Sequence, residues 1–444
     1  MTASGITQED LQAFAEQYHG DPIKQATAHA IARSGLSASA YRNQAKREIR
    51  HIFSLEIKTM PVTNQKASGR CWLFAGLNLL REDVARQYKL EEFELSQVYM
   101  AFWDKFEKIN YFLNTVLETL DEPASGRMVT WLMDSYADGG QWDMFINLVR
   151  KYGVVPKQAM PETFHSEATG VFNAVINTKL RKNAADLRRM HRSGAAMASL
   201  TEQKQAMVAE LYGTLCQCFG EPPRVFDWEF TDKDEQYTCY KDLTPLDFAA
   251  RFISLPLDDM VSVIHAPTQD KPFGRTFTVR YINNVIGGRP ILYLNLDMPD
   301  LKDLVLRQMQ AGEVVWFGSD VSHYGDREAG AWFSDLYDYE GILDLDLKMS
   351  KEDMLDYRQS AMNHAMVLTG VNLQDGKPNR WKIENSWGDE RGKKGYYIAD
   401  DGWFDRYVYQ AVINKKYLSD EQRAALAQKP IVLEPWDPMG TLAD

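Results

Sequence analysis

The chain has 444 residues, a formal net charge of −12 and 45% hydrophobic residues. This length and apolar content allow a large buried core and predict two or three subdomains. Abundant aromatic residues argue against disorder. The negative charge argues against general nucleic-acid binding, and the sequence contains no apolar run of ~18 residues that could span a membrane.

Cysteine usage and the N-terminus favour a cytoplasmic location. The four cysteines, Cys71, Cys216, Cys218 and Cys239, are too few for a disulfide framework in a chain of this size and fit a reducing compartment. The first residues lack the basic and apolar stretches of a signal peptide. Cys216 and Cys218 are closer in sequence than zinc ligands, which are usually separated by about two to four residues. We therefore expect neither a metal site nor a cofactor.

The first half of the chain is predicted to be mainly helical. Helical patterns cover residues 6–50, 93–120 and 128–152, and another helix is predicted from Cys71 to about residue 88. In that helix, apolar residues recur three and four positions apart, which is typical of a helix that buries one face. The stretch from about 160 to 250 reads as helical and irregular.

From about residue 275 the pattern changes to strands. Runs with strand propensity occur at 276–279, 291–294, 314–317, 364–371, 381–385 and 395–399. The sequence therefore predicts an α+β protein with a helical half followed by a sheet half. The cleft between two such halves is a common place for a substrate pocket.

A candidate nucleophile lies where a polar, glycine-containing loop meets the predicted helix. Cys71 begins that helix, where the positive end of the helix dipole favours the thiolate. Gln65, six residues earlier, can donate an amide N–H to a developing oxyanion. The alternative is a buried structural cysteine, but burial alone does not require the polar residues 64–70.

A candidate base and its orienting partner lie on a predicted hairpin. His364 begins one strand and Asn385 ends the next, and Asp375 and Gly376 between them form a strong turn signal. A turn there places residue 364 opposite residue 387, within two positions, and so brings Asn385 beside His364. Cysteine, histidine and an orienting amide are the groups that acyl transfer through a thioester requires.

These residues make the sequence resemble the papain-like cysteine peptidases, and more specifically their bleomycin hydrolase and aminopeptidase C branch. The general matches are Gln65, residues 68–72, His364 and residues 385–388. The matches to the branch are residues 63–76, 101–105, 384–388 and 435–443. The resemblance implies a papain-like fold with a helical half, an antiparallel β half and a helical insertion.

The resemblance also implies catalytic roles. Cys71 would be the nucleophile, His364 the general base and then acid, and Asn385 the residue that orients the imidazole. Gln65 and the backbone N–H of Cys71 would form the oxyanion hole. Trp387 would shield the Asn–His pair from water and border the substrate.

Further substrate-binding residues follow from the resemblance. Papain-like enzymes use a Gly-Gly pair to bind the substrate backbone, which makes Gly139 and Gly140 candidates; an ordinary turn and helix cap explains this pair equally well. Members of the branch often carry threonine before the histidine. Asn363 retains a hydrogen-bonding side chain at that position, so we expect an altered pH profile at most.

The spacing of the catalytic residues indicates an insertion. His364 follows Cys71 by 293 residues, whereas ~130–150 residues are usual in papain-type enzymes. The predicted organisation is an N-terminal helical hook region (1–60), a helical half with the nucleophile (61–160), a mostly helical insertion (161–270), a β half with His and Asn (271–425) and a C-terminal arm (426–444).

The C-terminal arm is rich in proline and has no helix or strand period. A frayed tail is the default for a terminus, but apolar residues such as Trp436 have surface to bury. The resemblance implies that the arm lies in the active-site cleft, where Ala443 and Asp444 bind the substrate. A terminal carboxylate there would pair with the α-ammonium of a peptide. The sequence leaves open whether Asp444 is retained or trimmed.

We therefore predict a cytoplasmic cysteine aminopeptidase that acts on short peptides with a free N-terminus, with bleomycin-hydrolase-like amide hydrolysis as a side activity. The resemblance also implies a homohexamer whose active sites face an internal channel, an assembly that closed symmetry permits. Two alternatives stay open. One is an endopeptidase of the same fold, if the arm does not block the cleft. The other is a non-catalytic oligomeric protein that binds peptides or nucleic acid.

Overall fold

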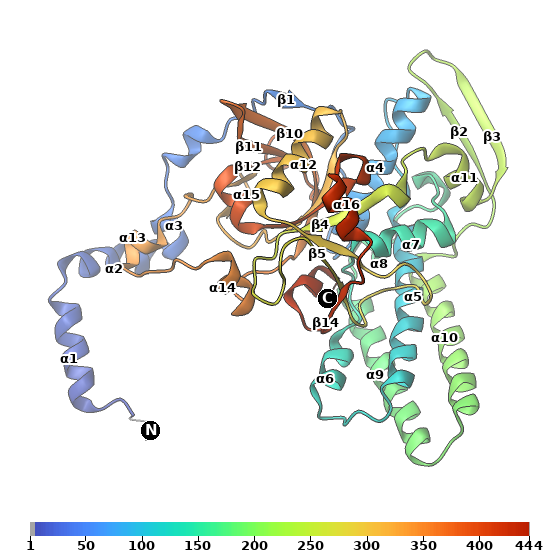
Figure 1. Cartoon of the computed structure of the whole chain (residues 1–444), viewed down its shortest axis with the longest axis horizontal. Coiled ribbons are helices and arrows are strands. Elements are labelled where there is room, and N and C mark those ends of the chain that lie inside the picture. The colour runs from blue at the N-terminus through green and yellow to red at the C-terminus, as the bar shows by residue number, and fades with distance from the viewer. Residues whose placement is uncertain (1–4, 444) are drawn as a thin grey trace.

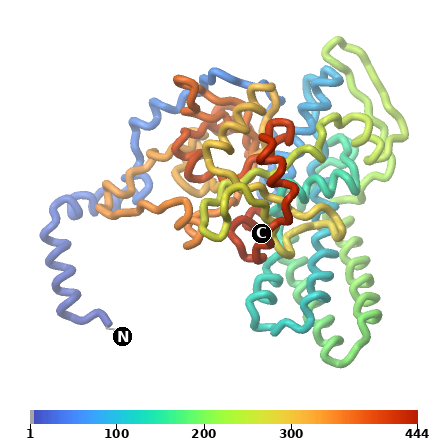
Figure 2. The backbone as a smooth tube through the Cα atoms, in the orientation of Figure 1, coloured from blue at the N-terminus to red at the C-terminus, as the bar shows by residue number. Residues whose placement is uncertain are grey.

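The computed structural model describes residues 5–443. They form a body of two halves, with an N-terminal arm extending from one side and two long helices from the other (Figure 1, Figure 2). The arm consists of α1 (Gln8–His19), α2 (Pro22–Ser34), α3 (Leu36–Ala40) and the 3-10 helix η1 (Ala45–Glu48). Neither α1 nor α2 buries a residue, so these helices contribute little to the core of the chain.

The helical half packs around α4. Its elements are α4 (Cys71–Tyr88), α5 (Gln97–Glu118), α6 (Arg127–Asp134), α7 (Trp142–Tyr152), η2 (Lys157–Ala159) and α8 (Phe164–Glu167). A Cβ at Gly76 would lie 2.9 Å from the ring of Phe145, so glycine allows α4 and α7 to approach closely. α4 ends at Lys89, whose backbone is left-handed with φ +51°.

The predicted insertion contains two long helices and a β hairpin. The helices α9 (Gly170–Arg192) and α10 (Met197–Phe219) pack on α5 and extend from the body (Figure 1). They are followed by β2 (Phe226–Thr231), β3 (Tyr237–Leu243), α11 (Pro245–Phe252) and η3 (Leu257–Asp259). Apart from the short β1, the first strand of the main sheet is β4 (Met260–Ile264), which lies before the predicted boundary at 271. The partners of β4 are distant in sequence, so local patterns do not mark it as part of the sheet.

The β half is a 12-stranded sheet with the strand order β14-β5-β6-β4-β13-β7-β10-β11-β12-β9-β8, and β1 also pairs with β10. Its strands after β4 are β5 (Arg275–Val279), β6 (Tyr293–Asn295), β7 (Val315–Ser319), β8 (Gly325–Asp326), β9 (Ala331–Trp332), β10 (His364–Gln374), β11 (Lys377–Glu384), β12 (Tyr396–Asp400), β13 (Val408–Asn414) and β14 (Ile431–Leu433); β1 is Leu55–Glu56. Its helices are α12 (Met298–Gln310), α13 (Tyr339–Leu343), α14 (Lys351–Asp356), α15 (Asp401–Tyr407), η4 (Lys415–Tyr417) and α16 (Asp420–Leu426).

The α+β class and papain-like architecture are confirmed, but the sheet is mixed. Most strand pairs are antiparallel, whereas β4–β6, β5–β14 and β9–β12 are parallel. The predicted antiparallel half is thus mainly antiparallel, and three parallel pairs are added to it. Parallel strands require long crossover connections, and the strand-forming pattern of a segment does not reveal which distant strand it will join.

The hairpin β10–β11 turns where the sequence predicts it. Asp375 and Gly376 both have positive φ, +51° and +77°, as the tight turns that match strand twist require. Val367 pairs with Glu384, and the same register continued to the strand ends places His364 opposite Trp387. On its other side β10 pairs with β7. His364 therefore begins a strand that is flanked on both sides.

The two halves share one hydrophobic core. Cys71 and Trp72 from α4 pack in the same buried cluster as Trp316 and Ala365 from the sheet, and Trp316 Nε1 donates to the Trp72 carbonyl over 3.3 Å. Close by in sequence, the buried Arg81 of α4 pairs with Glu384 of β11 at 2.8 Å. This packing fixes the nucleophile helix against the strands that carry the histidine and asparagine.

Candidate active site

The loop before α4 is joined to the sheet by backbone hydrogen bonds. The N–H of Gln65 donates to the carbonyl of Ser386 over 2.8 Å, and the N–H of Gly388 donates to the carbonyl of Thr63 over 3.0 Å. The N–H of Ala67 bonds to Glu167 near the end of α8. The loop therefore bridges the two halves and leads directly into Cys71 at the first position of α4.

His364 and Asn385 lie together, as the hairpin predicts. His364 Nε2 is 2.8 Å from Asn385 Oδ1. Because an amide oxygen can only accept, Nε2 carries the proton and Nδ1 keeps its lone pair. The ring of Trp387 stacks on the imidazole, with centroids 4.8 Å apart and planes at 27°. The indole thus covers one face of the histidine.

The thiol of Cys71 lies against the start of β10. Cys71 packs in the same buried cluster as Ala365, the residue after His364, and the backbone N–H groups of Ala365, Trp72 and Cys71 itself act to lower the pKa of the thiol. These donors stabilise a thiolate, which is the reactive form of cysteine. The structure therefore brings the cysteine and the histidine strand together across the seam between the halves.

Burial dominates the protonation of both groups in the substrate-free protein. Desolvation raises the pKa of Cys71 to about 11, against the smaller opposing effect of the three N–H donors. Desolvation lowers the pKa of His364 to about 4; the Asn385 hydrogen bond acts in the opposite direction, and the charge of Arg327 lowers the pKa further. Both shifts act against a charged form, so burial favours a neutral thiol and a neutral imidazole.

The side chain of Gln65 is held at both ends. Its Nε2 donates to the Ser68 carbonyl, which leaves its second N–H for another acceptor. Its Oε1 accepts from Ser386 Oγ over 2.6 Å. Because the Ser68 carbonyl can only accept, it fixes which end of the amide faces the loop, and the Ser386 hydroxyl donates to the other end. The contact between Ser386 and Gln65 was not predicted from the sequence. The position of Ser386 directly after Asn385 was the feature that could have indicated it.

Asp138 holds the loop before Cys71 in place. This role was also not predicted from the sequence. Its carboxylate accepts from the N–H of Gly69 at 3.0 Å and from Thr169 Oγ1 at 2.6 Å, and it pairs with the buried Lys105. Its carbonyl accepts from Trp72 Nε1 at 2.8 Å. The ion pair and hydrogen bonds outweigh desolvation and hold the pKa of Asp138 well below its usual range. Lys105 lies in the 101–105 match, but its partner is distant in sequence.

The Gly-Gly pair follows Asp138 and leads into α7. A Cβ on the buried Gly140 would lie 2.4 Å from the Trp72 ring, so packing alone requires glycine there. The carbonyl of the partly exposed Gly139 accepts from Lys108 Nζ. Packing against Trp72 therefore explains why residue 140 is a glycine. A contact of either glycine with substrate stays a prediction.

The side chain of Asn363 forms hydrogen bonds with the loop that follows β7. Its Nδ2 donates to Asp320 Oδ1 and Ser322 Oγ at 2.6 and 2.7 Å, and its Oδ1 accepts from the N–H of Val321 at 3.0 Å. These bonds use both ends of the amide. The amide of Asn363 thus braces this loop, and a contact of Asn363 with substrate stays a prediction.

The C-terminal arm enters the seam between the halves. Its last described segment is the 3-10 helix η5 (Pro438–Ala443), in which Leu442 and Ala443 are buried. Thr441 Oγ1 donates to the carbonyl of Met362, two residues before His364, over 2.8 Å. Tyr293 OH donates to the Met439 carbonyl over 3.0 Å. Asp444 lies outside the described residues.

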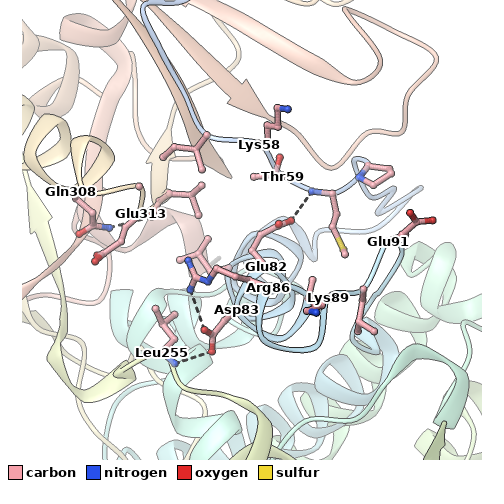
Figure 3. A pocket seen from close by; sticks show the side chains of 18 of the residues that line it. Lys58, Thr59, Glu82, Asp83, Arg86, Lys89, Glu91, Leu255, Gln308 and Glu313 are labelled. Atoms are coloured by element: carbon pink, nitrogen blue, oxygen red, sulfur yellow. Dashed lines mark hydrogen bonds and ion pairs between the residues drawn. The ribbon is translucent and has the colours of Figure 1, made fainter. Parts of the chain in front are cut away.

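A separate cavity of about 550 Å³ lies at the far end of α4 from Cys71 (Figure 3). Lys58 and Glu82 line it from one half, and Glu313 lines it from the other. The N–H of Met60 donates to Glu82 Oε1 over 2.8 Å. None of the predicted catalytic side chains lines this cavity.

Residues 5–443 contain neither a helix suited to cross a membrane nor a cluster of metal ligands. No helix there combines the length and the apolar character that crossing a membrane requires. In the same range, no cluster of three or more histidine, cysteine or acidic side chains is arranged to hold a metal ion. The four cysteines are free thiols.

Known proteins match the chain over its whole length. It is 44% identical to Aminopeptidase C of Lactobacillus delbrueckii subsp. lactis over 442 residues, which cover 99% of this chain and 98% of that protein. It is 41% identical to Aminopeptidase G of the same organism, covering 97% and 98%. The crystal structure of PepW from Lactobacillus rhamnosis HN001 superposes with a TM-score of 0.96 at 46% identity, covering 99% of each chain.

The match to a family agrees with the geometry. The sequence model of the Peptidase C1-like family matches residues 5–440, which include the cysteine, the histidine and the asparagine described above. The chain therefore belongs to the Peptidase C1-like family.

Proposed function

We propose that the chain is a cysteine aminopeptidase that removes N-terminal residues from short peptides through a thioester intermediate. The observation that carries the proposal is the position of the arm, whose Thr441 bonds to the Met362 carbonyl beside the His364 strand. The named aminopeptidases among the full-length relatives support the same activity. Bleomycin-hydrolase-like cleavage of other amides would use the same site.

In the proposed mechanism Cys71 sulfur attacks the substrate carbonyl while its proton passes to His364 Nδ1. The neutral thiol and imidazole that burial favours support proton transfer during the attack. The resulting oxyanion accepts from Gln65 Nε2 and the Cys71 N–H, donors of the kind that stabilise such intermediates. His364 then protonates the leaving amine as the C–N bond breaks.

Hydrolysis of the thioester completes the proposed cycle. His364 takes a proton from water, whose oxygen adds to the thioester carbon. Collapse of the second tetrahedral intermediate breaks the C–S bond and returns a proton to sulfur. Asn385 keeps the imidazole oriented through both steps, and stacked Trp387 limits the access of bulk water to the hydrogen-bonded pair.

Restriction to N-terminal residues would come from the arm. Buried Leu442 and Ala443 leave little room for a longer peptide on the side of the cleft that the arm occupies. We propose that the terminal carboxylate pairs with the α-ammonium of the substrate, an interaction worth roughly 1–3 kcal/mol as a charge-assisted hydrogen bond. Gly139 and Gly140 would contact the substrate backbone in the same cleft.

We further propose that the protein is a cytoplasmic homohexamer. The N-terminal arm supports assembly because Leu11, Phe14 and Tyr18 on α1 are 49%, 56% and 44% exposed at spacings of three and four, which places them on one helix face. Exposed apolar patches mark interaction surfaces. Four free thiols fit a reducing compartment.

The test compares two substrates and three proteins. A fluorogenic amino-acid amide with a free amine and its N-acetylated twin are offered to the full chain, to a chain ending at Gly440, and to the full chain with two glycines added after Asp444. The added glycines move the carboxylate without removing buried residues. Cys71→Ala provides the blank.

We expect the full chain to cleave only the free-amine substrate and both altered chains to lose this selectivity. Equal cleavage of both substrates by the full chain would instead indicate an endopeptidase. A wild-type rate no higher than that of Cys71→Ala would indicate a non-catalytic peptide- or nucleic-acid-binding protein.

A further inference from the structure

A basic pocket lies next to the ring that covers the histidine. This cavity of about 290 Å³, here called the Trp387 pocket, is lined by Asn64, Lys66, Arg327, Trp387, Glu390 and Arg391. Three of these side chains are cationic and one is anionic. The whole chain has a net charge of −12, so the positive charge of this pocket is opposite in sign to the charge of the chain.

The pocket and the C-terminal arm lie on opposite sides of the strand that begins with His364. On the β7 side, Leu442 of the arm packs near Gly318, the residue paired with Ala365. On the β11 side, Trp387 stacks on His364 and pairs with Asn64. A substrate whose N-terminus lies at the arm must therefore direct the part after the scissile bond toward the Trp387 pocket.

The cations of the pocket are held by local structure. Lys66 has a positive φ of +54°, and its N–H donates to Asn64 Oδ1 over 2.9 Å. The Arg327 guanidinium lies 4.7 Å from the centre of the Trp387 ring. Arg391 pairs with Glu328, which does not line the pocket, at 3.0 Å.

Two of the three cations have no carboxylate partner. Neither Lys66 nor Arg327 forms an ion pair with any residue in the described range. Arg327 lies over the ring that stacks on His364, and its charge also lowers the pKa of His364. A carboxylate that entered the pocket would thus meet available cations.

We propose that the Trp387 pocket binds a carboxylate of the leaving fragment and so gives the enzyme a preference among peptides. Two sources share this chemistry: an aspartate or glutamate side chain directly after the scissile bond, and the free C-terminal carboxylate of a dipeptide or tripeptide. This proposal rests on the proposed aminopeptidase function and specifies its substrates.

The expected size of the preference follows from the exposure of the pocket. An ion pair in water-accessible surroundings changes an equilibrium by about one- to fivefold, so the two unpaired cations together predict a several-fold gain in kcat/KM. Salt screens such pairs, with a Debye length of about 10 Å at 0.1 M. The preference should therefore shrink as ionic strength rises.

The experiment uses two pairs of dipeptides with a free N-terminus. Alanylglutamic acid α-amide against alanylglutamine amide isolates a side-chain carboxylate. Alanylalanine against alanylalanine amide isolates the terminal carboxylate. The kcat/KM ratio within each pair is measured for wild type, Lys66→Gln, Arg327→Gln and Arg391→Gln. Lys58→Gln is the matched control because it removes one exposed cation outside the Trp387 pocket (Figure 3).

We expect wild type and Lys58→Gln to prefer the carboxylate in at least one pair by about threefold or more, and Lys66→Gln and Arg327→Gln each to reduce that ratio by about two- to fivefold. The pair that responds identifies the source of the carboxylate. Ratios near one in both pairs, or ratios that Lys58→Gln lowers equally, would overturn the proposal while leaving the aminopeptidase function intact. Failure to cleave any of the four dipeptides would overturn both.

Discussion

The Nε2–H of His364 donates to Asn385 Oδ1 over 2.8 Å, although His364 begins β10 and Asn385 directly follows β11. The bond fixes the ring tautomer and leaves Nδ1 free to exchange a proton with sulfur. Asn385 makes no contact with the reaction centre in this scheme and acts through the imidazole. It is therefore a positioning residue.

Asn385→Ala should lower kcat/KM by about 10- to 100-fold, a part of the 10²–10⁴-fold that general acid–base catalysis contributes. The hydrogen bond raises the pKa of His364 against desolvation, so its loss should also move the acid limb of the pH–rate profile to lower pH. Steady-state kinetics from about pH 3 to 8 measure both effects. A reduced rate with an unmoved acid limb would contradict this role.

Ser386→Ala should lower kcat by about three- to tenfold, because Ser386 Oγ orients the Gln65 amide through a 2.6 Å hydrogen bond. Removal of a whole oxyanion donor costs about 10²–10³-fold, which is the expectation for Gln65→Ala. If Ser386 acts only through Gln65, the double variant should be no slower than Gln65→Ala alone. Additive losses would show that Ser386 acts by another route.

Asp138→Ala should destabilise the protein by about 3–5 kcal/mol, since it leaves the buried Lys105 without its partner. The pKa of Asp138 is lowered, so its contribution is present above pH 3.8 and is lost as pH falls through the folded-state pKa. Asp134→Ala, which removes an exposed carboxylate paired with Arg181, should cost no more than about 1 kcal/mol.

Chemical denaturation at pH 7 measures the free energy of unfolding of wild type and of these two variants. Asp138→Asn with Lys105→Met removes both buried charges and should recover part of the lost stability. Equal destabilisation by Asp138→Ala and Asp134→Ala would mean that the buried pair does not anchor the loop.

The catalytic hairpin could be predicted because its determinants are local. Asp375 and Gly376 define the turn, and the turn fixes the register that brings Asn385 to His364. Cys71 was placed at a helix start by the change from a polar loop to an apolar pattern. In each case a few neighbouring residues determine the backbone, so the sequence carries the information directly.

The supporting contacts could not be predicted because they join distant elements. Asp138 meets Lys105 across 33 positions and Gly69 across 69, and nothing near either residue marks the pairing. The parallel pair β4–β6 likewise depends on how whole segments cross the sheet. Asn363 has the hydrogen-bonding side chain on which the prediction relied. Its amide bonds to the 320–322 loop, and only the fold brings that loop close to it.

Glu82→Gln should stabilise the protein above neutral pH and have little effect at pH 4.5. Desolvation raises the pKa of Glu82 from 4.5 to about 7, against the opposing charge of Arg81. Between these pH values the folded state binds a proton that the unfolded state releases, so wild type loses stability as pH rises, whereas glutamine stays neutral. The gain at pH 8 should be about 1–3 kcal/mol, measured by thermal unfolding from about pH 4.5 to 8. Glu91→Gln, an exposed carboxylate in the same cavity (Figure 3), is the control, and a Glu82→Gln gain that does not depend on pH would contradict the burial argument.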